Sequence, residues 1–244
     1  VRFTEEYRAS RADEVQGFED YLQLEERLFA ELDAEVYSNV IPEAADALLR
    51  YTRGSASDPQ FREPNWNRTF ELPAGNPAGG VLLLHGMSDS PYSLRALGET
   101  LNRRGYWVVG LRLPGHGTAP SGLLDVRWED MAGATRLAVA RLAQKVGPAP
   151  IHLIGYSTGA PLALDFALDA IEGGAGPLPA SLVLVSPAIG IYRAAAMASW
   201  KRRSSSVPGL GNLAWLNVEP EFDPYKYNSF ATNAGDQVHR LTRS

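Results

Sequence analysis

The chain of 244 residues contains no cysteine. Disulfide bonds, thiolate metal sites and cysteine nucleophiles are therefore excluded, although the absence does not select a cellular compartment. No apolar run approaches the ~18 residues that a membrane-spanning helix needs, so we expect no transmembrane segment. A formal net charge of −5 argues against nucleic acid as the main partner, because nucleic-acid binding usually requires a basic face.

The composition that remains is that of an ordinary globular protein, with 45% hydrophobic and 21% charged residues. A chain of this length can bury a full core, and we expect one domain with additions rather than two domains. The sequence begins with Val1 rather than methionine. A signal or anchor removed before Val1 would not be visible, so a cytoplasmic and a periplasmic or secreted location both stay open.

Residues 151–159 read I-H-L-I-G-Y-S-T-G, an apolar run that ends in a G-x-S-x-G pattern. This pattern is typical of a nucleophile elbow, in which a serine stands on a tight turn between a strand and a helix. Gly155 and Gly159 are expected where the two backbones come too close for a side chain. Ser157 is predicted to project over the end of the sheet, at a helix N-terminus that favours a developing negative charge. The alternative is an ordinary strand–turn–helix with a surface serine.

A serine hydroxyl is a poor nucleophile without a base for its proton and hydrogen-bond donors for the oxyanion. The backbone N–H of Thr158, directly after the serine, is the first predicted donor. The second is expected in a loop after an earlier strand, and loop 85–90 follows the unbroken apolar run 81–84. Gly86 lets the backbone approach, and the N–H of Met87 is the candidate donor.

Strand and helix patterns alternate through residues 68–190, which we assign to one core. The predicted strands are 69–72, 81–84, 106–111, 151–156 and 182–185. The predicted helices are 90–104, 128–146 and 158–171. Such alternation predicts a mainly parallel sheet with helices on both faces.

Residues 1–67 are predicted to form a helical extension and a connector. Positions 1–13 are polar and without pattern, and helical apolar spacing over 15–37 predicts a helix started by a capping box of Asp13 and Gln16. We expect this helix to pack on the domain with a solvated acidic face, the alternative being a partner-binding helix. The acidic residues are Glu19, Asp20, Glu25, Glu26, Glu31 and Asp33.

Residues 191–244 no longer alternate between strand and helix and are rich in aromatic side chains. We interpret them as a cap or lid over the carboxyl edge of the sheet, where ligands of open α/β sheets bind. A surface excursion without substrate contact is the alternative. A helix is expected over 234–241.

Three runs together resemble the α/β-hydrolase fold: V-L-L-L-H-G-M-S-D-S-P-Y-S-L (81–94), G-L-R-L-P-G-H-G (110–117) and G-Y-S-T-G-A (155–160). Within that fold they are similar to the branch of monoacylglycerol lipases, small carboxylesterases and serine aminopeptidases. The resemblance covers about 69–190. It implies an α/β-hydrolase core, a Ser–Asp–His triad in that chain order, and acyl transfer to water through an acyl-enzyme on Ser157. It implies no metal and no cofactor. The expected substrate is a small carboxylic ester, and the aromatic cap favours a hydrophobic one.

The chain contains four histidines, each of which is a candidate for the catalytic base. The resemblance places His85 and His116 at loop-shaping positions. His152 stands near the start of the strand that leads to the elbow, about 16 Å from Ser157 at ~3.3 Å per residue. His239 falls on the flank of the expected helix without an evident carboxylate behind it, whereas a base must be held within about 3 Å of the serine oxygen. None of the four is therefore predicted to be the base.

After residue 185 the sequence shows no strand followed by Asp or by His. The catalytic Asp and His are expected beyond residue 244, together with the C-terminal strands of the sheet. We interpret the chain as the N-terminal part of a longer hydrolase, continuous in the gene or completed by a second fragment or chain. A serine peptidase or thioesterase of the same fold, and a non-catalytic module that lacks its Asp and His, stay open as alternatives.

Overall fold

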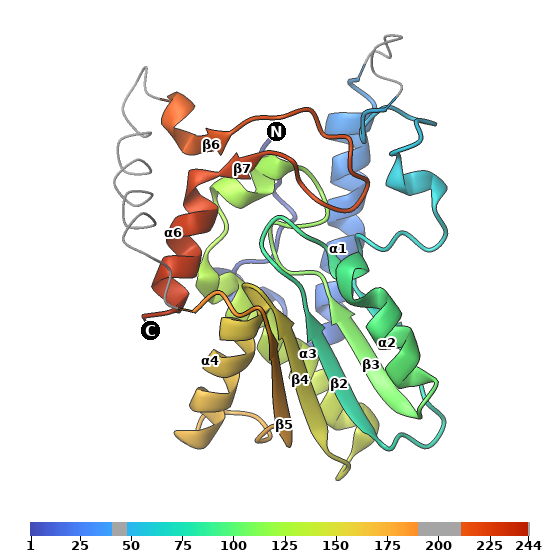
Figure 1. Cartoon of the computed structure of the whole chain (residues 1–244), viewed down its shortest axis with the longest axis vertical. Helices are drawn as coiled ribbons and strands as arrows, with labels where there is room; N and C mark the ends of the chain where they lie inside the picture. The colour runs from blue at the N-terminus through green and yellow to red at the C-terminus, as the bar shows by residue number, and fades with distance from the viewer. Residues whose placement is uncertain (41–47, 190–210, 244) are drawn as a thin grey trace.

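The computed structural model describes residues 1–40, 48–189 and 211–243. Its centre is a five-stranded sheet with the order β1-β3-β2-β4-β5 (Figure 1). The strands are β1 (Phe70–Leu72), β2 (Gly79–Leu84), β3 (Tyr106–Leu111), β4 (Ile151–Tyr156) and β5 (Ser181–Val185). Strand β1 is antiparallel to β3 and the other pairs are parallel, so the predicted mainly parallel sheet is confirmed.

The α-helices of the described residues are α1 (Phe18–Leu32), α2 (Arg95–Asn102), α3 (Trp128–Val146), α4 (Gly159–Ile171) and α6 (Thr232–Leu241). A π-helical turn, η2 (Asp33–Tyr37), continues α1. Short 3-10 turns are η1 (Ala9–Glu14), η4 (Pro59–Phe61), η5 (Pro91–Leu94), η6 (Pro120–Leu124) and η7 (Gly211–Ala214). The helix predicted over 90–104 is thus divided into η5, which begins at a proline, and α2.

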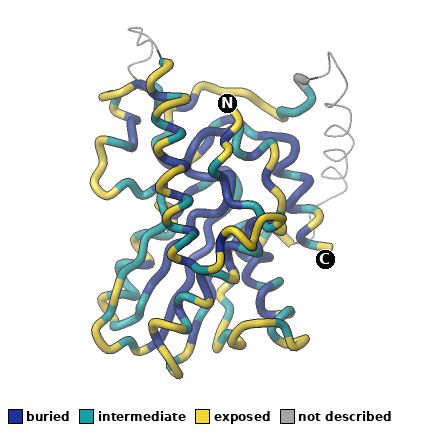
Figure 2. The backbone as a smooth tube through the Cα atoms, turned by 180° about the vertical axis from the view of Figure 1, so that it is seen from behind, coloured by how far each residue is buried: buried dark blue, intermediate teal, exposed yellow. Residues whose placement is uncertain are grey.

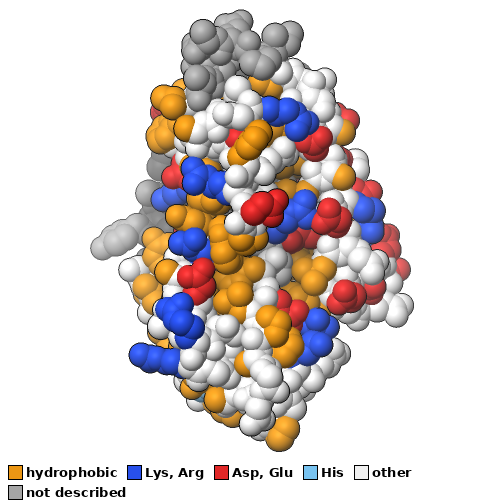
Figure 3. All heavy atoms as spheres, turned by 90° about the vertical axis from the view of Figure 1, so that its right-hand side faces the viewer, with side chains coloured by type: hydrophobic (Ala, Val, Ile, Leu, Met, Phe, Trp, Pro, Cys, Tyr) orange, Lys and Arg blue, Asp and Glu red, His pale blue; other side chains and the backbone are white. Residues whose placement is uncertain are grey.

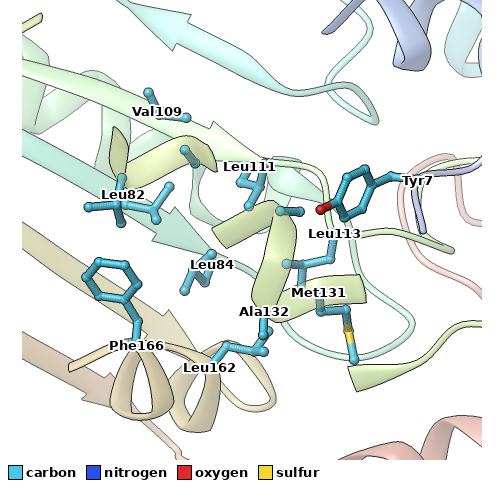
Figure 4. Packing of buried hydrophobic residues seen from close by; sticks show 14 of the residues in the cluster. Tyr7, Leu82, Leu84, Val109, Leu111, Leu113, Met131, Ala132, Leu162 and Phe166 are labelled. Atoms are coloured by element: carbon cyan, nitrogen blue, oxygen red, sulfur yellow. The ribbon is translucent and has the colours of Figure 1, made fainter. Parts of the chain in front are cut away.

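Helices cover both faces of the sheet because successive residues of a strand point to opposite sides. Leu82 and Leu84 of β2 belong to the larger core cluster, in which they pack with residues of α3 and α4 (Figure 4). Val81 and Leu83 point the other way, into a smaller cluster completed by Leu101 of α2. Figure 2 shows that buried residues run through the centre of the molecule and that exposed residues lie on its outer loops.

Strand β5 forms one edge of the sheet, and one side of it is open to solvent. Val183 pairs with Ile154 of β4, so the two side chains share a face. Ile154 is 8% exposed, whereas Val183 and Val185 are 46% and 41% exposed. Among the described residues, the helical cover on this face therefore ends before β5.

The start of α1 differs from the prediction. Gly17 occupies the N-cap position, and Asp20 accepts a hydrogen bond from the backbone N–H of Gln16 at 3.0 Å. Asp20, three residues after the N-cap, thus reaches back to the backbone as Gln16 was expected to do, and the predicted capping box of Asp13 and Gln16 was wrong. Asp13 lies instead in the 3-10 turn η1.

The acidic face of α1 is only partly solvated. Glu26 pairs with Arg68 at the surface, and the face in Figure 3 carries positive and negative side chains side by side. Glu25, however, is 4% exposed, and Glu6 from the apparently unpatterned N-terminus is 3% exposed. The expectation of a fully solvated face was therefore wrong for Glu25. Both buried carboxylates bind Arg112, which lies beyond β3 and was not visible to a local pattern.

The C-terminal region returns across the molecule as a short antiparallel pair, β6 (Trp215–Asn217) and β7 (Phe230–Ala231), followed by α6. In Figure 1 the segment that joins β6 to β7 lies above the sheet. The helix predicted over 234–241 is confirmed, with Val238 and Leu241 buried. No helix in the described ranges combines the length and apolar character needed to span a bilayer.

Candidate active site

Ser157 stands between the last residue of β4 and the first residue of α4. Its backbone has φ 52°, a left-handed conformation that is uncommon for a residue with a side chain. Two hydrogen bonds hold this turn: Ser157 N–H donates to Val185 O at 3.0 Å, and Ala188 N–H donates to Ser157 O at 3.1 Å. The side chain is half-buried. The turn thus has the strained strand-to-helix geometry of a nucleophile elbow.

The two glycines of the motif lie where backbones meet. A Cβ atom on Gly155 would come within 2.3 Å of Gly159 O, and one on Gly159 would come within 2.1 Å of Leu84 O. Both distances are far below van der Waals contact, and the neighbour in each case is backbone. Only glycine therefore allows β4 and α4 to approach each other and β2 this closely.

The predicted oxyanion donors are the N–H of Met87, in the loop after β2, and the N–H of Thr158, directly after Ser157. A Cβ atom on Gly86 would lie 3.2 Å from the Cβ of Ser157, so the loop after β2 passes directly beside the serine. Met87 follows Gly86, and Thr158 is buried at the N-cap position of α4. Neither the Met87 N–H nor the Thr158 N–H donates to another described residue. Both N–H groups are thus without an acceptor among the described residues.

His85 is fully buried and both of its ring nitrogens bind backbone. Nδ1 donates to Gly86 O at 2.9 Å, and Nε2 accepts from Leu113 N–H at 3.1 Å. Burial, the neighbouring His116 ring and the Arg112 charge lower the pKa of His85 well below its usual value. The neutral ring joins the loop after β2 to the loop after β3, and it has no nitrogen left to accept a proton from Ser157.

His116 is also buried, and its Nδ1 donates to Pro114 O at 2.9 Å. Burial lowers its pKa to about 4, so it is neutral at physiological pH. Its ring packs edge-on against His85 and parallel to Tyr227. It therefore belongs to the support of the two loops.

The two remaining histidines lie elsewhere. His152 is near the start of β4, the end opposite the serine, and its Nδ1 is 2.8 Å from Ser181 Oγ. His239 lies in the last turn of α6, with Arg243 Nη1 3.5 Å from its Nε2. All four histidines fall within the described residues, and none is hydrogen-bonded to Ser157.

Tyr227 is a supporting residue that the sequence analysis missed. Its backbone N–H donates to Ser88 O at 2.7 Å. Its buried hydroxyl accepts from Thr118 N–H at 2.9 Å and donates to Gly115 O at 3.2 Å. One residue thus binds both loop 85–90, which passes beside the serine, and loop 112–118. The only signal in the sequence was the aromatic composition of the C-terminal region, which does not single out a position.

Comparison with known proteins agrees with the fold. A model of the alpha/beta hydrolase family matches residues 81–242, and the chain belongs to this family. It is 34% identical over 94 residues to a thermostable monoacylglycerol lipase of Bacillus sp. (strain H-257), covering 38% of this chain and 37% of that protein. It is 31% identical over 132 residues to the dihydrolipoyllysine-residue acetyltransferase component of an acetoin cleaving system of Cupriavidus necator, covering 52% of this chain and 32% of that one. The chain thus spans about a third of the length of these curated relatives.

Solved structures show the same fold at low sequence identity. A metagenome-derived lipolytic enzyme superposes with a TM-score of 0.58 at 20% identity, covering 72% of this chain and 68% of that one. A soluble variant of monoglyceride lipase from Saccharomyces cerevisiae gives 0.52 at 15% identity, covering 71% and 64%. The monoacylglycerol lipase of Paleococcus ferrophilus gives 0.51 at 20% identity, covering 72% and 70%.

Proposed function

We propose that this chain carries the nucleophile and the oxyanion hole of a serine hydrolase that cleaves carboxylic esters, of the esterase or lipase type. The observation that carries the proposal is the placement of Ser157. It stands on a left-handed turn at the N-terminus of α4, beside a loop whose Met87 N–H has no partner among the described residues. The names of the lipase relatives support an ester as the substrate class.

In the proposed reaction, Ser157 Oγ forms a bond to the carbonyl carbon of the ester while its proton passes to a general base. The carbonyl oxygen becomes an oxyanion held by the N–H groups of Met87 and Thr158. The tetrahedral intermediate collapses to an acyl-enzyme, and the alcohol leaves with the proton from the base. Water, deprotonated by the same base, then attacks the acyl carbon and releases the acid and the free serine.

The base and its supporting acid are proposed to lie in polypeptide beyond residue 244 of the same protein. The hydrogen bonds of His85, His116, His152 and His239 support this, since each ring is engaged away from the serine. The position of β5 supports it as well, because β5 is an edge strand of the described sheet and the backbone groups along such an edge can pair with a further strand. Neither the comparisons nor the described residues point to a separate second fragment.

The domain assignment remains part of the proposal: 1–67 as an extension, 68–190 as the catalytic core and 191–244 as a cap. A hydrophobic acyl group is proposed to bind under the cap. Among the cap aromatics, Trp200 lies outside the described residues, and Trp215 in β6 is half-buried against the core.

The test is hydrolysis of p-nitrophenyl esters by the complete protein and by its Ser157→Ala variant. We expect a loss of roughly 10⁴-fold or more in kcat/KM. Ser181→Ala is the matched control, because Ser181 lies at the opposite end of the sheet. Peptide and thioester substrates are assayed in parallel. A stronger Ser157-dependent rate on either of them would move the assignment to a peptidase or thioesterase, and no activity on any would favour a non-catalytic module.

Residues 1–244 alone should be nearly inactive on the same esters, since they lack the proposed base. Full activity of this piece, abolished by His239→Ala, would contradict the placement of the base beyond residue 244.

A further inference from the structure

Three charged side chains form a buried cluster at the end of β3. Arg112 is 1% exposed, Glu6 is 3% and Glu25 is 4%. Arg112 Nη1 and Nη2 donate to the two carboxylate oxygens of Glu6 at 3.1 and 3.0 Å, and Nε donates to Glu25 Oε2 at 2.9 Å. Buried charges require such pairing, because desolvation of an unpaired ion costs several kcal/mol.

The cluster also binds backbone that leads to the active site. Gly115 N–H donates to Glu6 Oε2 at 2.8 Å, and Arg112 Nη1 donates to His116 O at 3.0 Å. Loop 112–118, which contains the G-H-G run, is therefore folded around the guanidinium. Both carboxylates come from the N-terminal extension, one from each side of η1.

Further contacts join the extension to the same loop. The Tyr21 hydroxyl donates to Arg112 O at 2.6 Å, Arg50 Nη2 donates to Gly117 O at 2.9 Å, and the Tyr51 hydroxyl donates to Thr118 O at 2.9 Å. Each of these acceptors is a backbone carbonyl of the loop. With the Glu6 bond to Gly115, the extension therefore binds the backbone of loop 112–118 at four residues.

Loop 112–118 is in turn connected to the predicted oxyanion loop through one side chain. Leu113 N–H donates to His85 Nε2, and His85 Nδ1 donates to Gly86 O. Gly86 lies against Ser157 and directly precedes Met87. A displacement of loop 112–118 would therefore move a hydrogen bond that orients the backbone beside the nucleophile.

We propose that Glu6 and Glu25 are positioning residues for the oxyanion hole, acting through Arg112, loop 112–118 and His85. The inference rests on the proposed function, because it assigns the N-terminal extension a role in placing the Met87 N–H. Neither carboxylate touches the reacting atoms. Their effect is on the geometry in which the transition state is bound, where a shift of about 1 Å lowers the rate by as much as 10²-fold.

Glu6→Gln is the informative variant. It keeps the size of the side chain but removes the charge and one acceptor oxygen of the bidentate pair. Arg112 keeps Glu25 as a counter-charge, so the cluster is not left with an unpaired cation. Glu5→Gln is the matched control, since Glu5 is the adjacent residue and pairs with Arg27 at the surface.

The first measurement is steady-state kinetics of the complete protein. We expect Glu6→Gln to lower kcat about tenfold or more and to change KM by less than about twofold, because only the transition state uses the oxyanion donors. The Ki of a trifluoromethyl ketone, which forms an oxyanion adduct with the serine, should rise by a similar factor. Glu5→Gln should match the wild type. Equal kcat values in Glu6→Gln and the wild type would overturn the proposal, as would a change confined to KM.

The second measurement is independent of catalysis and also uses the complete protein. Amide hydrogen exchange in peptides spanning 85–90 should be faster in Glu6→Gln than in Glu5→Gln. Unchanged exchange there would overturn the coupling, whatever the kinetics. If Glu6→Gln does not fold, Tyr51→Phe, which removes a single hydrogen bond to Thr118 O, is subject to the same criteria. Retention of activity by Ser157→Ala would refute the proposed function and leave the exchange result to decide the coupling alone.

Discussion

Ser157, the proposed nucleophile, stands in a strained backbone conformation. A non-glycine residue at φ 52° is disfavoured by of order 1–3 kcal/mol, and such a conformation persists only where the surroundings fix it. Two hydrogen bonds fix it here: Ser157 N–H donates to Val185 O, and Ala188 N–H donates to Ser157 O. The close packing of β4 against α4 restricts the turn further. This turn holds Ser157 next to the loop that contains Gly86 and Met87.

Gly159 gives a direct test of that crossing. Gly159→Ala would place its Cβ 2.1 Å from Leu84 O, and backbone cannot rotate out of the way as a side chain can. We expect a loss of about 3 kcal/mol in the free energy of unfolding, measured by urea denaturation. Gly75→Ala is the control, because a Cβ there meets nothing within 4 Å. Equal stability of the two variants would contradict the tight packing of the elbow.

His85 and His116 predict a pH dependence of stability. Their pKa values are lowered in the folded protein by burial, to about 4 for His116, whereas an exposed histidine has a pKa near 6.5. The unfolded state therefore binds protons first, and the stabilisation is fully present above pH ~6.5 and is lost as the pH falls toward the folded pKa. Between pH 7.5 and 5.5 we expect a loss of about 1 kcal/mol per histidine.

Chemical denaturation at the two pH values measures this effect, and His116→Gln should remove about half of the pH dependence. An unfolding free energy that does not change between pH 7.5 and 5.5 would show that the rings are not buried in the neutral form.

At the scale of elements, the sequence pattern predicts most strands and helices of the core correctly. The strands and helices between β3 and α4 were predicted to within a residue, because each is amphipathic or wholly apolar over its full length and ends at a glycine or loop.

Local sequence patterns gave wrong predictions where the burial of a residue depends on a partner far away in the chain. Glu25 reads as a surface residue of α1, and its burial follows from Arg112, 87 positions later. The helix start was predicted wrongly because the spacing of Asp13 and Gln16 fits a capping box, whereas Asp13 lies in the 3-10 turn η1 and the helix begins at Phe18.

In the candidate site, too, only residues that belong to a local sequence pattern could be predicted. Ser157, Met87 and Thr158 could be proposed because the nucleophile elbow and its partner loop have local sequence patterns. The residues that hold those loops could not, since Glu6, Arg50 and Tyr227 reach them from both ends of the chain.

A substitution at Tyr227 tests whether the C-terminal segment stabilises loop 112–118. Tyr227→Phe removes the acceptor of Thr118 N–H and leaves a buried donor without its partner. We expect a loss of about 1–3 kcal/mol in the free energy of unfolding. Tyr225→Phe serves as the control, since Tyr225 contacts Tyr92 by stacking of the rings, which phenylalanine retains. A Tyr227→Phe variant as stable as Tyr225→Phe would remove Tyr227 from the support of the loops.

Considered as a whole, the molecule concentrates many of its buried hydrogen bonds around loops 85–90 and 112–118. The N-terminal extension supplies two carboxylates and several donors to loop 112–118, and the C-terminal segment supplies Tyr227 to the same loop and to loop 85–90. The two apolar clusters that hold the β2 side chains lie on opposite faces of the sheet, and the larger one also includes Tyr21 and Tyr227, whose hydroxyl groups bind loop 112–118. The open face of β5 is the part of the sheet that this arrangement leaves uncovered in the described residues.

The central claim is that Ser157 is the nucleophile, and a covalent adduct tests it most directly. The complete protein is treated with a fluorophosphonate, digested, and mapped by mass spectrometry, with the Ser157→Ala variant alongside. We predict a single phosphonylated residue, Ser157, and no labelling of the variant. A protein that hydrolyses esters but is labelled at another residue, or is labelled equally in the Ser157→Ala variant, would contradict the account.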